Sequence, residues 1–135
     1  MRSGNTNIQN CKNVLLFSNS HRELGLNKRA MDMSGFAEHI QAESNTTSAL
    51  YYLVNADPVP EVVLASVGKN GKNAAGFVEE YEKLPGHVKA KSALILLYEN
   101  ENEGNELFRN YRQLKKPLCV PELCDLLKVE RSTLN

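Results

Sequence analysis

Pro60-Glu61-Val62-Val63-Leu64-Ala65-Ser66 is the stretch that decides the fold, because four consecutive apolar residues follow its acidic residue and end at a serine. An apolar run without alternation is typical of a strand that is covered on both faces, as in parallel sheets. Residues 14–17 (VLLF) and 93–97 (ALILL) form two more runs of this kind. The sequence therefore predicts at least three buried strands.

Segments with the spacing of helices separate these strands, and two shorter segments resemble outer strands. Strands that alternate with helices pair in parallel through right-handed crossovers, which places helices on both faces of one sheet. The sequence therefore predicts an α/β fold, a flavodoxin-like doubly wound sheet of five parallel strands in the order 2-1-3-4-5. The expected helices run through Leu24, Leu26 and Met31 and at 44–54, 74–84 and 120–127, and the expected outer strands lie at 36–40 and 114–116.

The topology also predicts where a functional crevice should lie. In such sheets the crevice forms beyond the carboxyl ends of the strands, where the strand order reverses. Ser18 and Asn19 follow the first strand, and Ser66 follows the third. Tyr98 follows the fourth strand and Lys116 the fifth. We expect these five residues to share one edge of the sheet.

Length and composition fit one globular domain. The 135 residues are 41% hydrophobic and carry 16 basic and 16 acidic side chains, so the formal net charge is zero. Nucleic-acid binders usually show a basic excess because phosphate contacts dominate their affinity, and we therefore expect no nucleic-acid partner. We expect a domain at 13–130, a flexible tail at 1–12 and a short tail at 131–135.

The chain is expected in the cytoplasm. Its longest apolar run is too short to span a bilayer, and its polar N-terminus lacks the apolar region of a signal peptide. The odd set of Cys11, Cys119 and Cys124 does not indicate a disulfide framework, so reduced thiols are expected.

In order and spacing, these motifs resemble the response-regulator receiver domain, the CheY-like module of two-component signalling. The best match is 60–66, followed by Asn73-Ala74 and by 77–81 (FVEEY), where receivers of one common type have a glycine and then a helix that begins with phenylalanine. Lys115-Lys116-Pro117-Leu118 is similar to the lysine-proline pair of the family. The similarity runs from about residue 13 to residue 130, nearly the whole chain.

The resemblance implies a phosphorylation site that this chain has lost. Receivers need an aspartate nucleophile, where this chain has Ser66, and an acidic pair for Mg²⁺, where it has Ser18 and Asn19. The phosphoryl-binding Ser/Thr position falls on Tyr98, or on Leu97 if the strand shifts by one residue; the lysine remains. Because Mg²⁺ is usually held by carboxylates, we expect no metal, no cofactor and no catalytic residue in this degenerate receiver.

The resemblance further implies a function in protein binding, as a pseudo-receiver in a two-component-type pathway or phosphorelay. The partner would be a histidine kinase, another regulator or a second copy of the chain. Receivers commonly dock or dimerise through the fourth helix, fifth strand and fifth helix, which here correspond to about 101–128. Phe108, Tyr111 and Leu118 are the candidate contacts on that face, provided that they are exposed.

Two alternatives remain open at this point. An active receiver would need a shifted acceptor, but Asp57 precedes its strand and so lies at the wrong end of the sheet. A small-molecule or anion binder could use the same crevice, since one fold hosts many functions. Lys116 would then meet an anion there, whereas the simpler expectation is a solvated side chain or an ion pair with Glu99 or Glu101.

Overall fold

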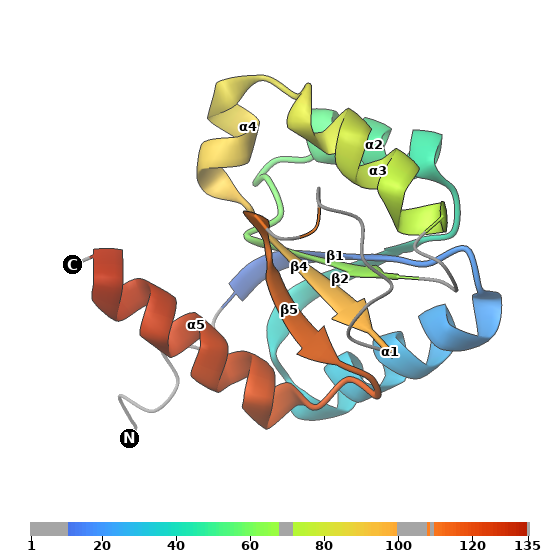
Figure 1. The fold of residues 1–135 in the computed structure, drawn as a ribbon. Coiled ribbons are helices and arrows are strands. Elements are labelled where there is room, and N and C mark those ends of the chain that lie inside the picture. The colour runs from blue at the N-terminus through green and yellow to red at the C-terminus, as the bar shows by residue number, and fades with distance from the viewer. Residues whose placement is uncertain (1–10, 68–71, 100–107, 109, 135) are drawn as a thin grey trace.

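A computed structural model describes residues 11–67, 72–99, 108 and 110–134, with side chains left undescribed at 72, 73 and 128–134. Five parallel strands form one sheet in the order β2-β1-β3-β4-β5, which confirms the predicted fold (Figure 1). The elements are β1 (Cys11–Phe17), α1 (His21–Ser34), β2 (Ala37–Glu43), α2 (Thr46–Asn55), β3 (Val62–Ser66), α3 (Lys72–Glu82), α4 (Gly86–Lys91), β4 (Ala93–Tyr98), β5 (Arg112–Lys115) and α5 (Val120–Leu134).

Helices cover both faces of the sheet. In Figure 1, α2, α3 and α4 lie on one face, and α1 and α5 lie on the other. The core is divided accordingly, so that neighbours such as Leu15 and Leu16 belong to clusters on opposite faces. Phe17 of β1 stacks on Phe77 of α3 with ring centroids 4.7 Å apart. This two-sided burial is the reason why the central strands β1, β3 and β4 contain continuous apolar runs.

The helix ends follow local capping chemistry. The Ser20 hydroxyl accepts a hydrogen bond from the Glu23 amide (3.2 Å) and so caps α1. The Asn45 side chain caps α2 by accepting a hydrogen bond from the Ser48 amide (2.9 Å). Gly35 ends α1 at φ 68°, where a side chain would be strained.

Several predicted boundaries need correction. β1 begins at Cys11, inside the predicted tail, because Cys11 is buried against the sheet and pairs in register with Ala37. α5 continues to Leu134, through residues predicted as a tail, because neither glycine nor proline interrupts 122–134. The extra helix α4 was not predicted, because it directly follows Pro85 and begins at Gly86, and such a pair is typical of a turn.

The connections of β1 create the crevice. Its partner on one side is β2 and its partner on the other side is β3. The chain leaves β1 through α1 on one face of the sheet and reaches β3 through α2 on the other face (Figure 1). The carboxyl ends of β1 and β3 therefore form the predicted crevice.

Candidate functional site

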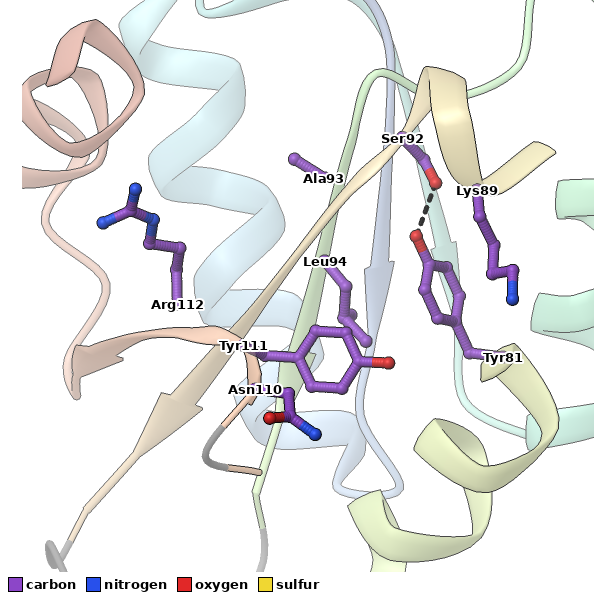
Figure 2. A pocket seen from close by; sticks show the side chains of 8 residues that line it. All are labelled: Tyr81, Lys89, Ser92, Ala93, Leu94, Asn110, Tyr111 and Arg112. Atoms are coloured by element: carbon purple, nitrogen blue, oxygen red, sulfur yellow. Dashed lines mark hydrogen bonds between the residues drawn. The ribbon is translucent and has the colours of Figure 1, made fainter. Parts of the chain in front are cut away.

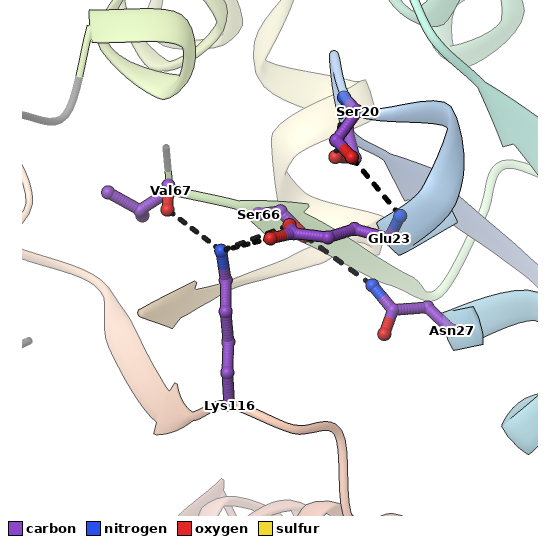
Figure 3. Close-up of polar contacts among 7 residues, drawn as sticks. Ser20, Glu23, Asn27, Ser66, Val67 and Lys116 are labelled. Atoms are coloured by element: carbon purple, nitrogen blue, oxygen red, sulfur yellow. Dashed lines mark hydrogen bonds and ion pairs between the residues drawn. The ribbon is translucent and has the colours of Figure 1, made fainter. Parts of the chain in front are cut away.

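Lys116 joins three elements at the carboxyl edge of the sheet. Its Nζ lies 3.0 Å from both Oε1 and Oε2 of Glu23 and donates to the backbone carbonyl of Val67 at 3.0 Å (Figure 3). The two side chains are 16% and 36% exposed, respectively. The ammonium therefore has a carboxylate and a carbonyl as partners in a site partly shielded from water.

The partner of Lys116 differs from the one that the sequence favoured. Glu101 lies outside the described residues, and Glu99 lines the same cavity, whereas the ion pair is with Glu23. Glu23 stands in the first turn of α1, which begins directly beyond β1. An acidic residue in a first turn is favoured by the helix dipole, and here that turn faces the end of β5.

Ser66, the last residue of β3, is buried at 3% exposure. Its hydroxyl accepts a hydrogen bond from the Asn27 amide at 3.4 Å (Figure 3). Asn27 lies four residues after Glu23 on α1, so both side chains project from one side of that helix. The residue at the predicted acceptor position is thus held by the same helix that holds Lys116.

The residues at the acid-pair positions are engaged elsewhere. The Ser18 hydroxyl accepts from the Ser20 amide at 3.1 Å, and the exposed Asn19 donates its side-chain amide to the Ser44 carbonyl at 3.2 Å. The first contact lies within the β1–α1 turn, and the second joins this turn to the β2–α2 connection. Within the described part of the chain, no three histidine, cysteine or acidic side chains gather so that they could hold a metal ion.

Tyr98 does not join this group. It is half-buried and packs against the cluster under α2, α3 and α4, on the other face of the sheet from the Ser66 side chain. Leu97, the alternative for that position, is the residue in register with Ser66 and is buried in the second cluster. The structure thus brings Ser66 and Lys116 together and directs Tyr98 away.

Sequence reasoning missed Glu23 and Asn27. The Ser20-x-x-Glu23 spacing is that of a capping box, which would have placed Glu23 in the first turn of a helix. Four-residue spacing would then have added Asn27 to the same side. No sequence pattern indicates that either residue lies next to the end of a strand far along the chain.

A cavity of about 420 Å³ opens beside these residues. Two basic and two acidic side chains line it, so its formal charge is balanced, and the ammonium of Lys116 is already paired. Such a lining does not concentrate anions. The lining residues are Ser20, Arg22, Glu23, Leu26, Asn27, Ser66, Glu99, Lys116 and Pro117.

A larger cavity of about 610 Å³ lies at the opposite end of the sheet, where β4 and β5 begin (Figure 2). Tyr81 and Tyr111 meet there edge to face at 6.2 Å and 78°. The Tyr81 hydroxyl bonds with that of Ser92 (2.6 Å), and Tyr111 donates to Glu82 (2.8 Å). We place the candidate site in the smaller cavity, because it lies at the switch point of the sheet.

The two tyrosines should ionise late in an alkaline titration. Burial raises the pKa of Tyr81, and burial together with the carboxylate of Glu82 raises the pKa of Tyr111 above the ordinary value of 10.0. The contribution of the two neutral tyrosines to the stability of the folded chain is therefore complete below pH 10. It is lost as the pH rises through their raised pKa values. In an absorbance titration at 295 nm, Tyr111→Phe should remove an ionisation step well above pH 10. Loss of a step near pH 10 would contradict this assignment.

Comparison with known proteins supports the fold. A response regulator receiver protein from Dyadobacter fermentans has a TM-score of 0.75 at 22% identity, over 87% of this chain and 95% of that chain. A two-component response regulator from Cytophaga hutchinsonii reaches 0.73 at 20% identity, over 88% and 96%. The chemotaxis response regulator CheY4 of Vibrio cholerae reaches 0.62 at 16% identity, over 90% and 98%. The chain therefore has the fold of receiver domains.

Sequence comparison gives no closer assignment, since no protein-family model matches the chain and no curated protein is significantly similar to it.

Proposed function

We propose that this chain is a pseudo-receiver, a non-enzymatic signalling module that binds a protein partner in a two-component-type pathway without being phosphorylated. One observation carries the proposal. The acceptor position at the end of β3 holds a buried serine, while the carboxylate that Lys116 contacts comes from Glu23 of α1. The crevice thus has an internal ion pair where a receiver would form a phosphoaspartate.

The chemistry of the remaining groups supports this proposal. An acyl phosphate requires a carboxylate, which Ser66 lacks. The Ser66 hydroxyl accepts a hydrogen bond from Asn27, and an amide cannot serve as the base that would activate a hydroxyl nucleophile. Mg²⁺ loses water reluctantly and is usually held by carboxylates, whereas Ser18 and Asn19 offer a hydroxyl and an amide.

The interaction face predicted at 101–128 remains a proposal, and fewer of its candidate residues are exposed than the prediction requires. Phe108 is buried and so does not meet the condition of exposure, whereas Tyr111 and Leu118 are half-buried. The strongly exposed large apolar side chains of the described residues lie elsewhere, on α1 and α2. They are Leu26, Met33, Tyr51 and Val54.

The partner is proposed to be a protein: a histidine kinase, another regulator or a second copy that forms a homodimer. The zero net charge speaks against nucleic acid. None of the helices in the described part of the chain is long and apolar enough to cross a membrane. A cytoplasmic location is proposed because the odd set of three cysteines does not indicate a disulfide framework.

A titration followed by backbone amide NMR tests the proposal. Mg²⁺ and then beryllofluoride, a mimic of the phosphoryl group, should leave the amides of Ser18, Ser66 and Lys116 unmoved. A receiver with its full set of aspartates serves as the positive control. Saturable shifts that require Mg²⁺ would overturn the proposal, whereas shifts caused by inorganic phosphate or flavin mononucleotide alone would favour a small-molecule binder.

A further inference from the structure

The outer edge of β2 carries backbone groups that have no strand partner among the described residues. Within the described residues, β2 lies at the end of the sheet and pairs with β1 alone. The Glu43 carbonyl accepts from the Ser18 amide, so the backbone of Glu43 faces β1. Since alternate residues of a parallel strand bond to opposite sides, Glu38, Ile40 and Ala42 direct their N–H and C=O groups outward.

This edge lacks several of the usual protections against strand addition. Proteins commonly protect an exposed edge with lysine, proline or a very short strand. β2 has seven residues and contains neither lysine nor proline. A further extended segment could therefore pair along it.

A groove lies beside this edge, between β2 and α2. Its volume is about 580 Å³, and Tyr51, which lines it, is 70% exposed. On the floor, Gln41 contacts the His39 ring at 3.1 Å and donates to the Glu43 carboxylate at 2.6 Å. The lining residues are Gln41, Glu43, Thr47, Ser48, Tyr51, Tyr52, Asn55 and Ala56.

The charge of the segment that forms β2 and α2 indicates which kind of partner fits it. Residues 37–57 contain Glu38, Glu43 and Asp57 but no lysine or arginine, although the whole chain has 16 basic residues. A second copy that paired through its own β2 would bring acidic strands together, which is unfavourable. The edge therefore complements a basic segment rather than itself.

We propose that the β2 edge and the β2–α2 groove bind an extended, basic peptide segment of a partner protein, which adds to the sheet as a sixth strand. The inference rests on the proposed function in so far as it names a partner class. Main-chain hydrogen bonds would come from Glu38, Ile40 and Ala42, and alternate side chains would enter the groove. There a lysine or arginine meets the Glu43 carboxylate and the exposed ring of Tyr51.

A nine-residue peptide that alternates lysine with valine or threonine is the probe. Its addition should cause saturable amide shifts confined to β2 and α2, and should slow hydrogen exchange at Ile40 and Ala42. Two control peptides should not bind: one with glutamate for lysine, and one with prolines at the positions that face β2, which removes their N–H donors.

Matched variants distinguish specific binding of the peptide to the β2–α2 surface from non-specific binding elsewhere. Tyr51→Ala and Glu38→Lys should each weaken binding about fivefold. Met33→Ala removes an even more exposed apolar side chain (80%) from α1, on the other face of the sheet, and should not change binding. Equal binding of the acidic peptide, or unchanged binding by both β2–α2 variants, would overturn the inference. The Mg²⁺ titration probes the crevice, so failure of either proposal can be recognised separately.

Discussion

Aspartates at positions 18, 19 and 66 together should give the chain a Mg²⁺-dependent site for beryllofluoride, which we expect to be absent from the unmodified chain. The register of β1 and β3 pairs Phe17 with Ala65, so residues 18 and 66 follow at the ends of adjacent strands. Neighbouring strands lie about 4.8 Å apart, which lets carboxylates at both ends share one cation. Lys116 already lies at this edge.

Without metal, the triple variant should be less stable than the unmodified chain. Position 66 is buried, and its new carboxylate would stand beside Glu23 and compete with it for Lys116. Mg²⁺ at about 100 times its Kd should restore about 2.7 kcal/mol, seen as a rise of several degrees in Tm. The unmodified chain should show no such rise.

Two further variants locate the effect. Ser66→Asp alone supplies an acceptor without the acidic pair and should bind beryllofluoride far more weakly than the triple variant. Glu23→Ala in the triple background removes the competing carboxylate and should strengthen binding. A folded triple variant whose Tm and amide spectrum ignore both Mg²⁺ and beryllofluoride would show that the crevice does not have receiver geometry.

The fold was predictable because its signals are local. Continuous apolar runs such as 62–65 mark strands buried on both faces, and their alternation with helical segments leaves few topologies. Element ends were less predictable, since Cys11 becomes part of β1 only through its pairing with Ala37. The start of β1 is therefore set by a tertiary contact rather than by the strand preference of the residue itself.

The candidate site was predictable only in part, for a related reason. Topology places Ser66 and Lys116 at one edge of the sheet regardless of side-chain detail. The ion pair joins residues 93 positions apart, and it depends on which way the first turn of α1 faces. Tyr98 shows the same limit, because one step along β4 moves a side chain to the other face.

The Glu23–Lys116 pair should contribute about 1–2 kcal/mol to the free energy of unfolding. A fully buried pair costs about 3–5 kcal/mol when one partner is removed, and an exposed pair is worth less than about 1 kcal/mol. With side chains 36% and 16% exposed, this pair lies between those limits. Both Glu23 oxygens contact the ammonium, which favours the upper part of the range.

A double-mutant cycle with Glu23→Gln, Lys116→Met and the combined variant measures this coupling by urea unfolding. Lys28 and Asp32 provide the matched control, because they pair at 2.9 Å on the same helix but are 44% and 50% exposed. Their cycle should give about 0.3–0.5 kcal/mol, as exposed pairs four residues apart do. If the Glu23–Lys116 coupling is no larger than this control, the pair is merely solvated and does not fix the crevice. A clearly larger coupling would support an internal carboxylate that holds the lysine where phosphoaspartate would.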